Sequence, residues 1–194
     1  MLFVLFSITC FATTIDFEGL PSFAPIPNGY MGLDWDNFST IDGSFDPFTN
    51  SGYANGAVSG PRVAYNIAGS TASIASGTPF DLVSGYFAAA WNDGLVLTIL
   101  AYRSGSLVGS DSFAVYTSGA TFRTFHFHGI DTVTFSSAGG TLNPNVTGSG
   151  MQFTMDSLTI LLPSQTVPEP GSTALLGGGL ALLAFLATRL RAHL

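Results

Sequence analysis

The sequence contains no lysine, a single cysteine and few charged residues of any kind, at 9% of 194 residues. The lone thiol of Cys10 excludes an intramolecular disulfide and any zinc site that needs several thiolates. The five basic residues are all arginines and face twelve acids. Because Arg189 and Arg191 stand among the last six residues, the rest of the chain is distinctly acidic, which argues against nucleic acid as a partner.

The sequence also lacks the common short motifs of enzymes. No Gly-x-Ser-x-Gly nucleophile elbow, phosphate-binding loop or His-Glu-x-x-His zinc motif occurs. A glycoside hydrolase would need two facing carboxylates, and sequence alone cannot pair the acids that are present. We therefore expect a non-catalytic protein, with a secreted glycan-active enzyme on the same scaffold as the alternative.

The first twelve residues, MLFVLFSITCFA, form an apolar segment with small residues at Cys10 and Ala12. This small-x-small ending is typical of a signal-peptidase site and predicts a signal peptide over residues 1–12, cleaved after Ala12. No Lys or Arg precedes the apolar segment, so a buried first strand is the alternative interpretation.

A second apolar segment of nineteen uncharged residues runs from Pro170 to Thr188. As a helix it would be about 28 Å long, close to the thickness of a bilayer's hydrocarbon core. Arg189 and Arg191 follow it and orient the C-terminus toward the cytoplasm, since positive residues stay on that side. The predicted parts are a linker over 164–170, a single transmembrane helix over 171–188 and a basic cytoplasmic tail over 189–194.

The triplet Pro168, Glu169 and Pro170 stands directly before this span. Two prolines hold the chain extended, which suits a peptide presented to a processing enzyme. The triplet, the span and the terminal arginines together resemble the PEP-CTERM sorting signal of Gram-negative bacteria. The resemblance implies an exosortase as partner, cleavage near the triplet, and delivery to the cell surface or the exopolysaccharide matrix. A membrane-anchored domain whose tail is never cut is the alternative.

Residues 13–163 show short apolar runs separated by turn residues about every ten positions, a pattern that favours an all-β fold. We predict an antiparallel two-sheet, jelly-roll-like sandwich, with the seventeen phenylalanines of the chain supplying its core. The run at 95–102 is apolar on both faces and predicts a central strand. In the expected strand at 132–136, Val133 and Phe135 should point inward. The expected strands are 95–102, 107–116, 121–127, 132–136 and 151–162, with a turn at 103–106 and a loop at 139–150.

Four stretches resemble a family of exported, mostly uncharacterised bacterial and fungal β-sandwich proteins. They read IDFEGL (15–20), IPNGYMGLDWDNF (26–38), AAWNDG (89–94) and FTMDSL (153–158). Bacterial members often carry the PEP-CTERM tail. The resemblance implies the sandwich fold and an exported location, and it brings no enzyme activity with it.

Asp16, Glu18 and Asp156 resemble the acids that hold a structural calcium between the first and last strands of carbohydrate-binding jelly rolls. Calcium prefers six to eight oxygen ligands, so the chemistry is reasonable. Asp156 is in phase with Leu158 and Ile160 and is expected to point inward, where an unpaired carboxylate is costly. A cation or backbone amides would satisfy it there, and a bulge that turns it to solvent is the alternative.

Aromatic residues that could stack on sugar rings are Tyr30, Trp35 and Trp91, with Tyr53 and Tyr86 as further members of the set. Both tryptophans stand beside turn-forming residues, and core filling is the competing interpretation. His126 and His128 are two apart on one strand face and could ligate a metal. Because Phe125 and Phe127 occupy the other face, the histidines are expected to face solvent.

The sequence thus predicts an exported protein, anchored in the inner membrane by its C-terminal helix and released by processing to the cell surface or matrix. Polysaccharide is the expected ligand class.

Overall fold

A computed structural model describes residues 10–163 of the chain. Within this range the regular secondary structure is almost entirely β-strand, with one helical turn, α1 (Gly52–Asn55), and three short 3-10 turns. The strands are β1 (Cys10–Ile15), β2 (Ala24–Pro25), β3 (Asp34–Asp36), β4 (Phe38–Asp42), β5 (Arg62–Asn66), β6 (Ala72–Ala89), β7 (Asn92–Asp93), β8 (Leu95–Arg103), β9 (Ser106–Val115), β10 (Thr121–Ala138), β11 (Thr141–Leu142) and β12 (Phe153–Pro163). The 3-10 turns are η1 (Tyr30–Gly32), η2 (Phe48–Asn50) and η3 (Ile67–Gly69).

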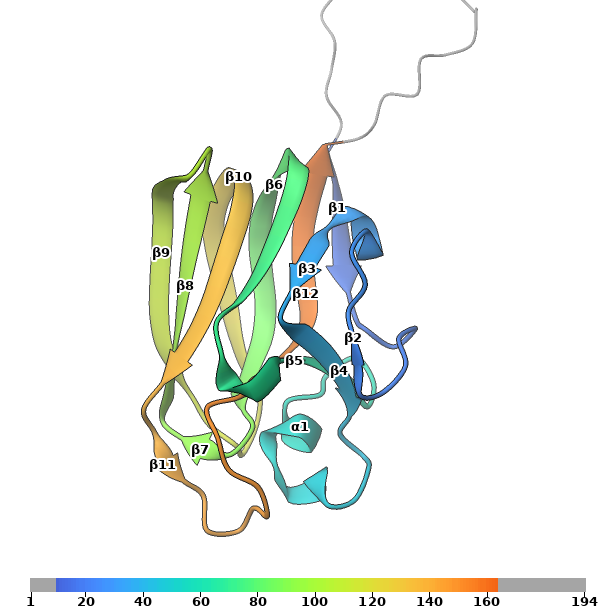
Figure 1. Ribbon diagram of the computed structural model, residues 1–194, viewed down its shortest axis with the longest axis vertical. Helices are drawn as coiled ribbons and strands as arrows, with labels where there is room; N and C mark the ends of the chain where they lie inside the picture. Colours follow the sequence, from blue (N-terminus) through green and yellow to red (C-terminus); the bar gives the residue numbers. More distant parts are fainter. Residues whose placement is uncertain (1–9, 164–194) are drawn as a thin grey trace, which may run out of the picture. The chain divides into compact units, whose positions relative to one another are not determined.

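All strand pairs are antiparallel, and the main order is β2-β4-β5-β12-β6-β10-β8-β9, with β1 added to β12 and β3 added to β6. The two long strands, β6 and β10, have 18 residues each and bend over at the top of Figure 1. The second half of β6 pairs with the first half of β10, and the first half of β6 pairs with the second half of β10. Each long strand therefore crosses from one layer to the other at its bend. One continuous hydrogen-bonded sheet thus folds over to form both layers of the sandwich.

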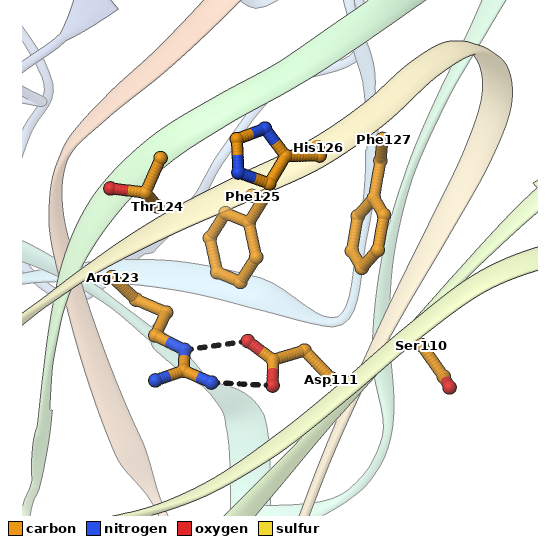
Figure 2. Close-up of a pocket in the computed structure, with 7 residues that line it drawn as sticks. All are labelled: Ser110, Asp111, Arg123, Thr124, Phe125, His126 and Phe127. Carbon is orange, nitrogen blue, oxygen red and sulfur yellow. Dashed lines mark hydrogen bonds and ion pairs between the residues drawn. The ribbon is translucent and has the colours of Figure 1, made fainter.

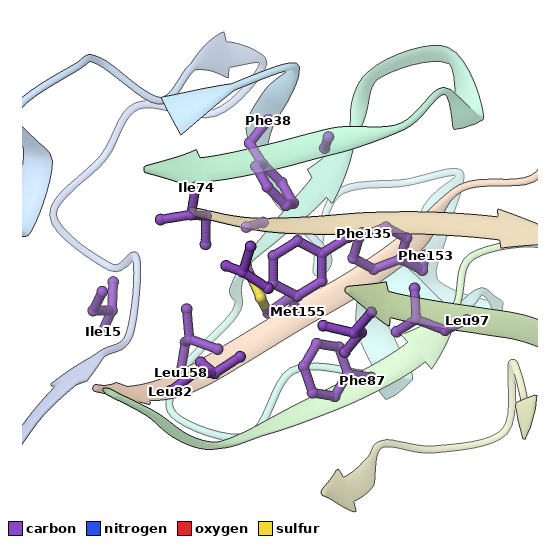
Figure 3. Packing of buried hydrophobic residues seen from close by; sticks show 14 of the residues in the cluster. Ile15, Phe38, Ile74, Leu82, Phe87, Leu97, Phe135, Phe153, Met155 and Leu158 are labelled. Carbon is purple, nitrogen blue, oxygen red and sulfur yellow. The ribbon is translucent and has the colours of Figure 1, made fainter. Parts of the chain in front are cut away.

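The core lies between the two layers and combines phenylalanine rings with a larger number of aliphatic side chains. Side chains alternate between the two faces of a strand, so every second residue of β8, β10 and β12 points into the core. Phe135 stacks on Phe153 at 6.0 Å between ring centroids, and Phe38 meets Phe135 edge-on at 5.6 Å. Figure 3 shows these rings packed with Leu97, Met155 and other apolar residues. Each fully buried ring contributes about 1.5–3 kcal/mol by leaving water.

The predicted antiparallel sandwich is confirmed, and so are the inward positions of Val133 and Phe135, both 0% exposed. The prediction of a central strand at 95–102 is confirmed in that β8 pairs with β10 on one side and with β9 on the other, but only one of its two faces is buried. In β8 Leu95 and Leu97 are buried whereas Val96 is 42% exposed. The reason is position, because β8 lies one strand from the sheet edge and its outer face has no layer above it.

Two strands that the sequence separates, 121–127 and 132–136, are parts of one strand, β10. Register shifts between Thr124 and Thr132 accommodate the bend between them. The predicted turn at 103–106 is confirmed as the β8–β9 connection, and the closing strand is confirmed as β12.

The start of β1 overlaps the predicted signal peptide, since Cys10–Ala12 pair with Leu161–Pro163 of β12. Cleavage after Ala12 would leave Thr13–Ile15 in this strand, and the cleavage site stays a prediction. Most of the signal segment, the linker, the Pro168-Glu169-Pro170 triplet, the transmembrane helix and the tail with Arg189 and Arg191 lie outside the described residues. Among residues 10–163, no helix is long and apolar enough to cross a membrane.

Candidate functional site

Trp35 and Tyr30 belong to the main core. Trp35, on β3, is 6% exposed, and its indole N–H donates a hydrogen bond to the Tyr30 carbonyl oxygen at 3.0 Å. Its ring meets Phe17 and Phe38 edge-on, at 5.8 and 5.6 Å between centroids. Tyr30 is half-buried, and burial together with the negative charge of Asp16 raises the pKa of its hydroxyl. The core-filling interpretation therefore holds for Trp35, whose ring is covered by protein.

Trp91 lies in a second, smaller cluster beside α1. It is 6% exposed and packs edge-on against Tyr53 at 5.2 Å between centroids. Gly148 covers the indole so closely that a β-carbon at that position would lie 2.3 Å from the ring. Both tryptophans are thus enclosed, and neither lines an open cleft with acids, the arrangement that would favour the enzyme alternative.

The three acids predicted to hold calcium all lie around the segment Val58–Arg62, which follows α1. Glu18 accepts a hydrogen bond from the Arg62 backbone N–H at 2.8 Å. Asp16 accepts one from the backbone N–H of Glu18 at 3.2 Å. Asp156 is 0% exposed and faces the same segment, opposite to the core residues Met155 and Leu158. The topology therefore brings the three acids to one region of the fold.

The bonding of Asp156 does not fit a calcium ligand. One carboxylate oxygen accepts the backbone N–H groups of Val58 and Ser59, at 2.7 and 2.9 Å. The other accepts the Ser59 hydroxyl at 2.7 Å and the Ser157 N–H at 2.6 Å. Ligands must present free lone pairs to a cation, whereas these oxygens already face hydrogen-bond donors. No group of three His, Cys, Asp or Glu side chains within residues 10–163 is arranged to hold a metal ion.

The expectation that Asp156 shares the inward face of Leu158 and Ile160 is wrong, and backbone amides satisfy its buried carboxylate on the other face. A bulge is present, because Ser157 has a φ of 49° and the ladder between β12 and β6 shifts after Asp156. The bulge lets Asp156 and Leu158 face opposite sides of the sheet. The carboxylate is then covered by the loop above it and satisfied by amides.

His126 and His128 face solvent, as expected from Phe125 and Phe127 on the other face of the strand. The Nδ1 atom of His128 lies 2.8 Å from a carboxylate oxygen of Asp81 on the neighbouring strand β6. The second oxygen of Asp81 accepts the Gly129 N–H at 2.7 Å. Burial raises the pKa of Asp81, but the hydrogen bonds from His128 and Gly129 outweigh it and leave this pKa below its ordinary value.

An open cleft of about 320 Å³ lies between β9 and the first half of β10 (Figure 2). It is formed where the edges of the two layers face each other. β6 pairs with one side of β10 from Thr121 to Phe135, whereas β8 joins the other side only from Thr132 onward. One edge of the first half of β10 is consequently without a strand partner within the described residues. The lining residues are Ser110, Asp111, Arg123, Thr124, Phe125, His126 and Phe127.

Two of the lining residues, Asp111 and Arg123, form an ion pair. The Arg123 guanidinium donates two hydrogen bonds to the Asp111 carboxylate, from Nε at 2.6 Å and from a terminal nitrogen at 2.7 Å, as Figure 2 shows. Hydrogen bonding from Arg123 lowers the pKa of Asp111, and the same contact raises that of Arg123. The guanidinium also lies 5.0 Å from the centroid of the Phe113 ring. The pair is therefore fixed in direction, and 41% of the Arg123 side chain stays exposed.

Aromatic rings form the wall of the cleft beside this pair. Phe125 stacks on Phe127 at 5.5 Å between centroids. Phe127 lies against Gly109 of β9, where a β-carbon would come within 2.6 Å of the ring. A flat apolar surface thus stands next to a paired carboxylate and guanidinium, with hydroxyl and imidazole groups at the rim.

Sequence reasoning did not single out this cleft. The alternation of Arg123, Phe125 and Phe127 with polar residues was visible as a strand pattern. Nothing in the sequence indicated that Asp111 would face Arg123 across two different layers.

The arrangement of the strands defines the chain as an antiparallel β-sandwich, and comparisons with solved structures give the same class. It is similar to a DUF4465 family protein from Bacteroides caccae, with a TM-score of 0.52 at 13% identity over 80% of this chain and 87% of that one. A DUF4465 family protein from Bacteroides ovatus gives 0.44 at 10% identity over 83% and 96%. The carbohydrate-binding module TmCBM61, solved with β-1,4-galactotriose, gives 0.41 at 10% identity over 75% and 100%.

The first of these likenesses shows a shared fold, and scores below 0.5 do not establish one. No protein-family model matches the sequence. No curated protein matches it either.

Proposed function

We propose that this protein is an exported, non-catalytic polysaccharide-binding β-sandwich and that the cleft between β9 and β10 holds a sugar residue. The observation that carries the proposal is the Asp111–Arg123 pair beside the Phe125 and Phe127 rings. Small-ligand sites combine an apolar wall with a few fixed polar groups, and this cleft has both.

The chemistry of the cleft suits a neutral sugar. A sugar hydroxyl both donates and accepts, so it can bond to the Asp111 carboxylate and the Arg123 guanidinium at once. The C–H faces of a pyranose ring are apolar and can lie against the exposed part of Phe127. The Thr124 and Ser110 hydroxyls stand at the rim for further hydrogen bonds. An acidic sugar is less suited, because Asp111 already occupies the donors of Arg123 that face it.

The non-catalytic role is supported by the acid content of the cleft. Its lining contains one carboxylate, Asp111, and the Arg123 pair lowers the pKa of that group. Glycoside hydrolysis takes two carboxyl groups, one of them protonated. If the chain were a glycan-active enzyme, it would release reducing ends from a polymer, and the Asp111→Asn variant would stop that release.

Export and sorting complete the proposal. The PEP-CTERM-like tail directs the chain to an exosortase, which would separate the sandwich from its membrane helix. Mass analysis of the mature protein from its host tests this step. A C-terminus near Pro168–Pro170 supports processing, whereas a retained peptide ending at Leu194 refutes it.

A glycan array with the full-length chain tests the binding site. The array should carry neutral and acidic oligosaccharides, β-1,4-galactotriose among them. We expect Asp111→Asn and Arg123→Gln each to weaken binding about tenfold, since each leaves a charged partner without its hydrogen bonds. The matched controls are Asp131→Asn and Arg103→Gln, which lie outside the cleft lining. Equal losses in the controls, or no binding by the wild-type chain, would refute the proposal.

A further inference from the structure

The outward side of the same strands carries a second set of features, of which only Thr124 and His126 also line the cleft. In β10, Phe122, Thr124, His126 and His128 are exposed and alternate with inward-facing residues. Directly paired residues on antiparallel strands place their side chains on the same face. We call the outward side chains of β10 and their partners on β6 and β12 the outer strip. Its members are Asp81, Ser84, Tyr86, Phe122, Thr124, His126, His128 and Thr159.

One end of the outer strip is aromatic. Phe122 pairs with Tyr86 in the ladder, and their ring centroids are 4.9 Å apart. Phe122 is 54% exposed, whereas many other phenylalanines of the chain are buried in the core. An exposed ring supported by a second ring offers an apolar surface that is held in place.

The middle of the outer strip is a row of hydroxyl groups. Thr124 pairs with Ser84, Ser84 pairs with Thr159, and Thr159 pairs with Thr14 of β1. Adjacent strands are about 4.8 Å apart, so the three strip hydroxyls span roughly 10 Å across the sheet, and Thr14 beside the strip extends the row to roughly 14 Å. Hydroxyl groups donate and accept, which matches the hydrogen-bonding pattern of a sugar polymer.

The charges on the strip are paired within it. Asp81 accepts hydrogen bonds from Gly129 and lies 2.8 Å from His128. The strip therefore offers no free carboxylate for a cationic partner. The net negative charge of the whole chain also disfavours a polyanion.

The outer strip is continuous with the cleft, because Thr124 and His126 belong to both. From Phe122 to His128 the strand extends for about 20 Å. That length exceeds one sugar residue, so an extended chain that enters the cleft at the edge of β10 can continue over the strip.

We propose that the outer strip binds an extended, neutral polysaccharide chain, with Tyr86 and Phe122 as its stacking surface and Ser84, Thr124 and Thr159 as its hydrogen-bonding row. This inference rests on the proposed function and deepens it, since it makes the ligand a polymer bound along its length rather than a free sugar or a chain end. The cleft then binds one sugar residue of a polysaccharide that the outer strip binds along its length.

The test compares polymers with short sugars. The full-length chain in detergent is run on affinity gels that contain neutral galactan, xylan or mannan, and it is titrated with the matching di- and trisaccharides. We expect Tyr86→Ala with Phe122→Ala to weaken polymer binding about tenfold or more, because aromatic anchors dominate binding energy. Trisaccharide binding in the cleft should change by less than about twofold. The matched control, Tyr102→Ala with Phe45→Ala, removes one tyrosine and one exposed phenylalanine elsewhere and should leave both affinities unchanged.

A milder variant keeps the test independent of folding. Ser84→Ala with Thr159→Val preserves side-chain volume closely, leaves the cleft lining unchanged and should weaken polymer binding by about threefold to tenfold, with unchanged melting.

Each outcome separates the two proposals. Loss of trisaccharide binding in Asp111→Asn together with full polymer binding in the Tyr86/Phe122 variant would keep the cleft and overturn the strip. A wild-type chain that binds neither polymer nor trisaccharide would refute both. A change from dimer to monomer in the Tyr86/Phe122 variant, at unchanged polymer affinity, would assign the strip to a second copy of the chain and overturn the proposal.

Discussion

Replacing Asp156 by asparagine tests how the fold holds a fully buried carboxylate. Asp156 accepts three backbone N–H groups and one hydroxyl, at 2.6 to 2.9 Å. Asparagine has the same shape, but its NH2 group would point at donors and leave them without an acceptor. A buried donor without a partner costs about 1–3 kcal/mol. Val58 and Ser59 are exposed residues, so water can take up part of the loss.

We therefore expect Asp156→Asn to lower the free energy of unfolding by about 3 kcal/mol. For a chain of this size that corresponds to a fall in Tm of about 6–12 °C, measurable by circular dichroism or calorimetry. Asp36→Asn is the matched control, because Asp36 is an exposed residue of β3, and it should change stability by less than about 0.5 kcal/mol.

The same experiment decides between amides and calcium as the partners of this carboxylate. With amides as partners, a chelator should leave the Tm of the wild-type chain unchanged. A fall in Tm with chelator that added calcium restores, and that Asp156→Asn abolishes, would refute the hydrogen-bonding explanation. It would instead support the calcium site predicted from Asp16, Glu18 and Asp156.

Three further predictions concern the core and the cleft. Phe135→Ala should cost about 3–5 kcal/mol in urea unfolding, because the ring is 0% exposed and its removal leaves a cavity between the layers; a cost below about 1 kcal/mol would contradict the packing. Asp81 and Asp111 have lowered pKa values in the fold, so the stability they add is present above the unfolded pKa of about 3.9 and is lost as the pH falls through the lower folded values. The urea midpoint of unfolding should therefore fall as the pH drops below about 4, and Asp111→Asn should make this fall smaller. An identical pH profile in the variant would exclude Asp111 as a source of the pH dependence. Gly109→Ala should push Phe127 aside, since its β-carbon would lie 2.6 Å from the ring, at a cost of about 1–3 kcal/mol by thermal unfolding. Gly77→Ala is the matched control, because Gly77 has open space around it and no positive φ.

Much of the fold could be predicted because strand patterns are local. Period-two alternation at 132–136 indicated which side chains enter the core, and Gly-containing turns marked the hairpin between β8 and β9. The bend that joins 121–127 to 132–136 was missed, because register shifts depend on the partner strand β6 and leave no local signal.

The candidate site was less accessible to sequence reasoning. Trp35 and Trp91 attracted attention by residue type, yet burial depends on which loops cover them, and Gly148 covers Trp91 from a distant part of the chain. The sequence did not indicate that Phe122 is exposed, because its exposure follows from its position on the outward face of an edge strand. Residue type alone therefore does not distinguish aromatic side chains of the core from those of the surface.

Local chemistry in the chain was sufficient for the all-β class, for the inward faces of the later strands and for an acidic surface poor in cations. Three-dimensional pairing was needed to bring Asp111 to Arg123, to set Tyr86 beside Phe122 and to surround Asp156 with amides. The physical reason is that alternation along a strand is a property of neighbouring residues, whereas contacts between layers depend on how β6 and β10 bend and which strands meet at their edges.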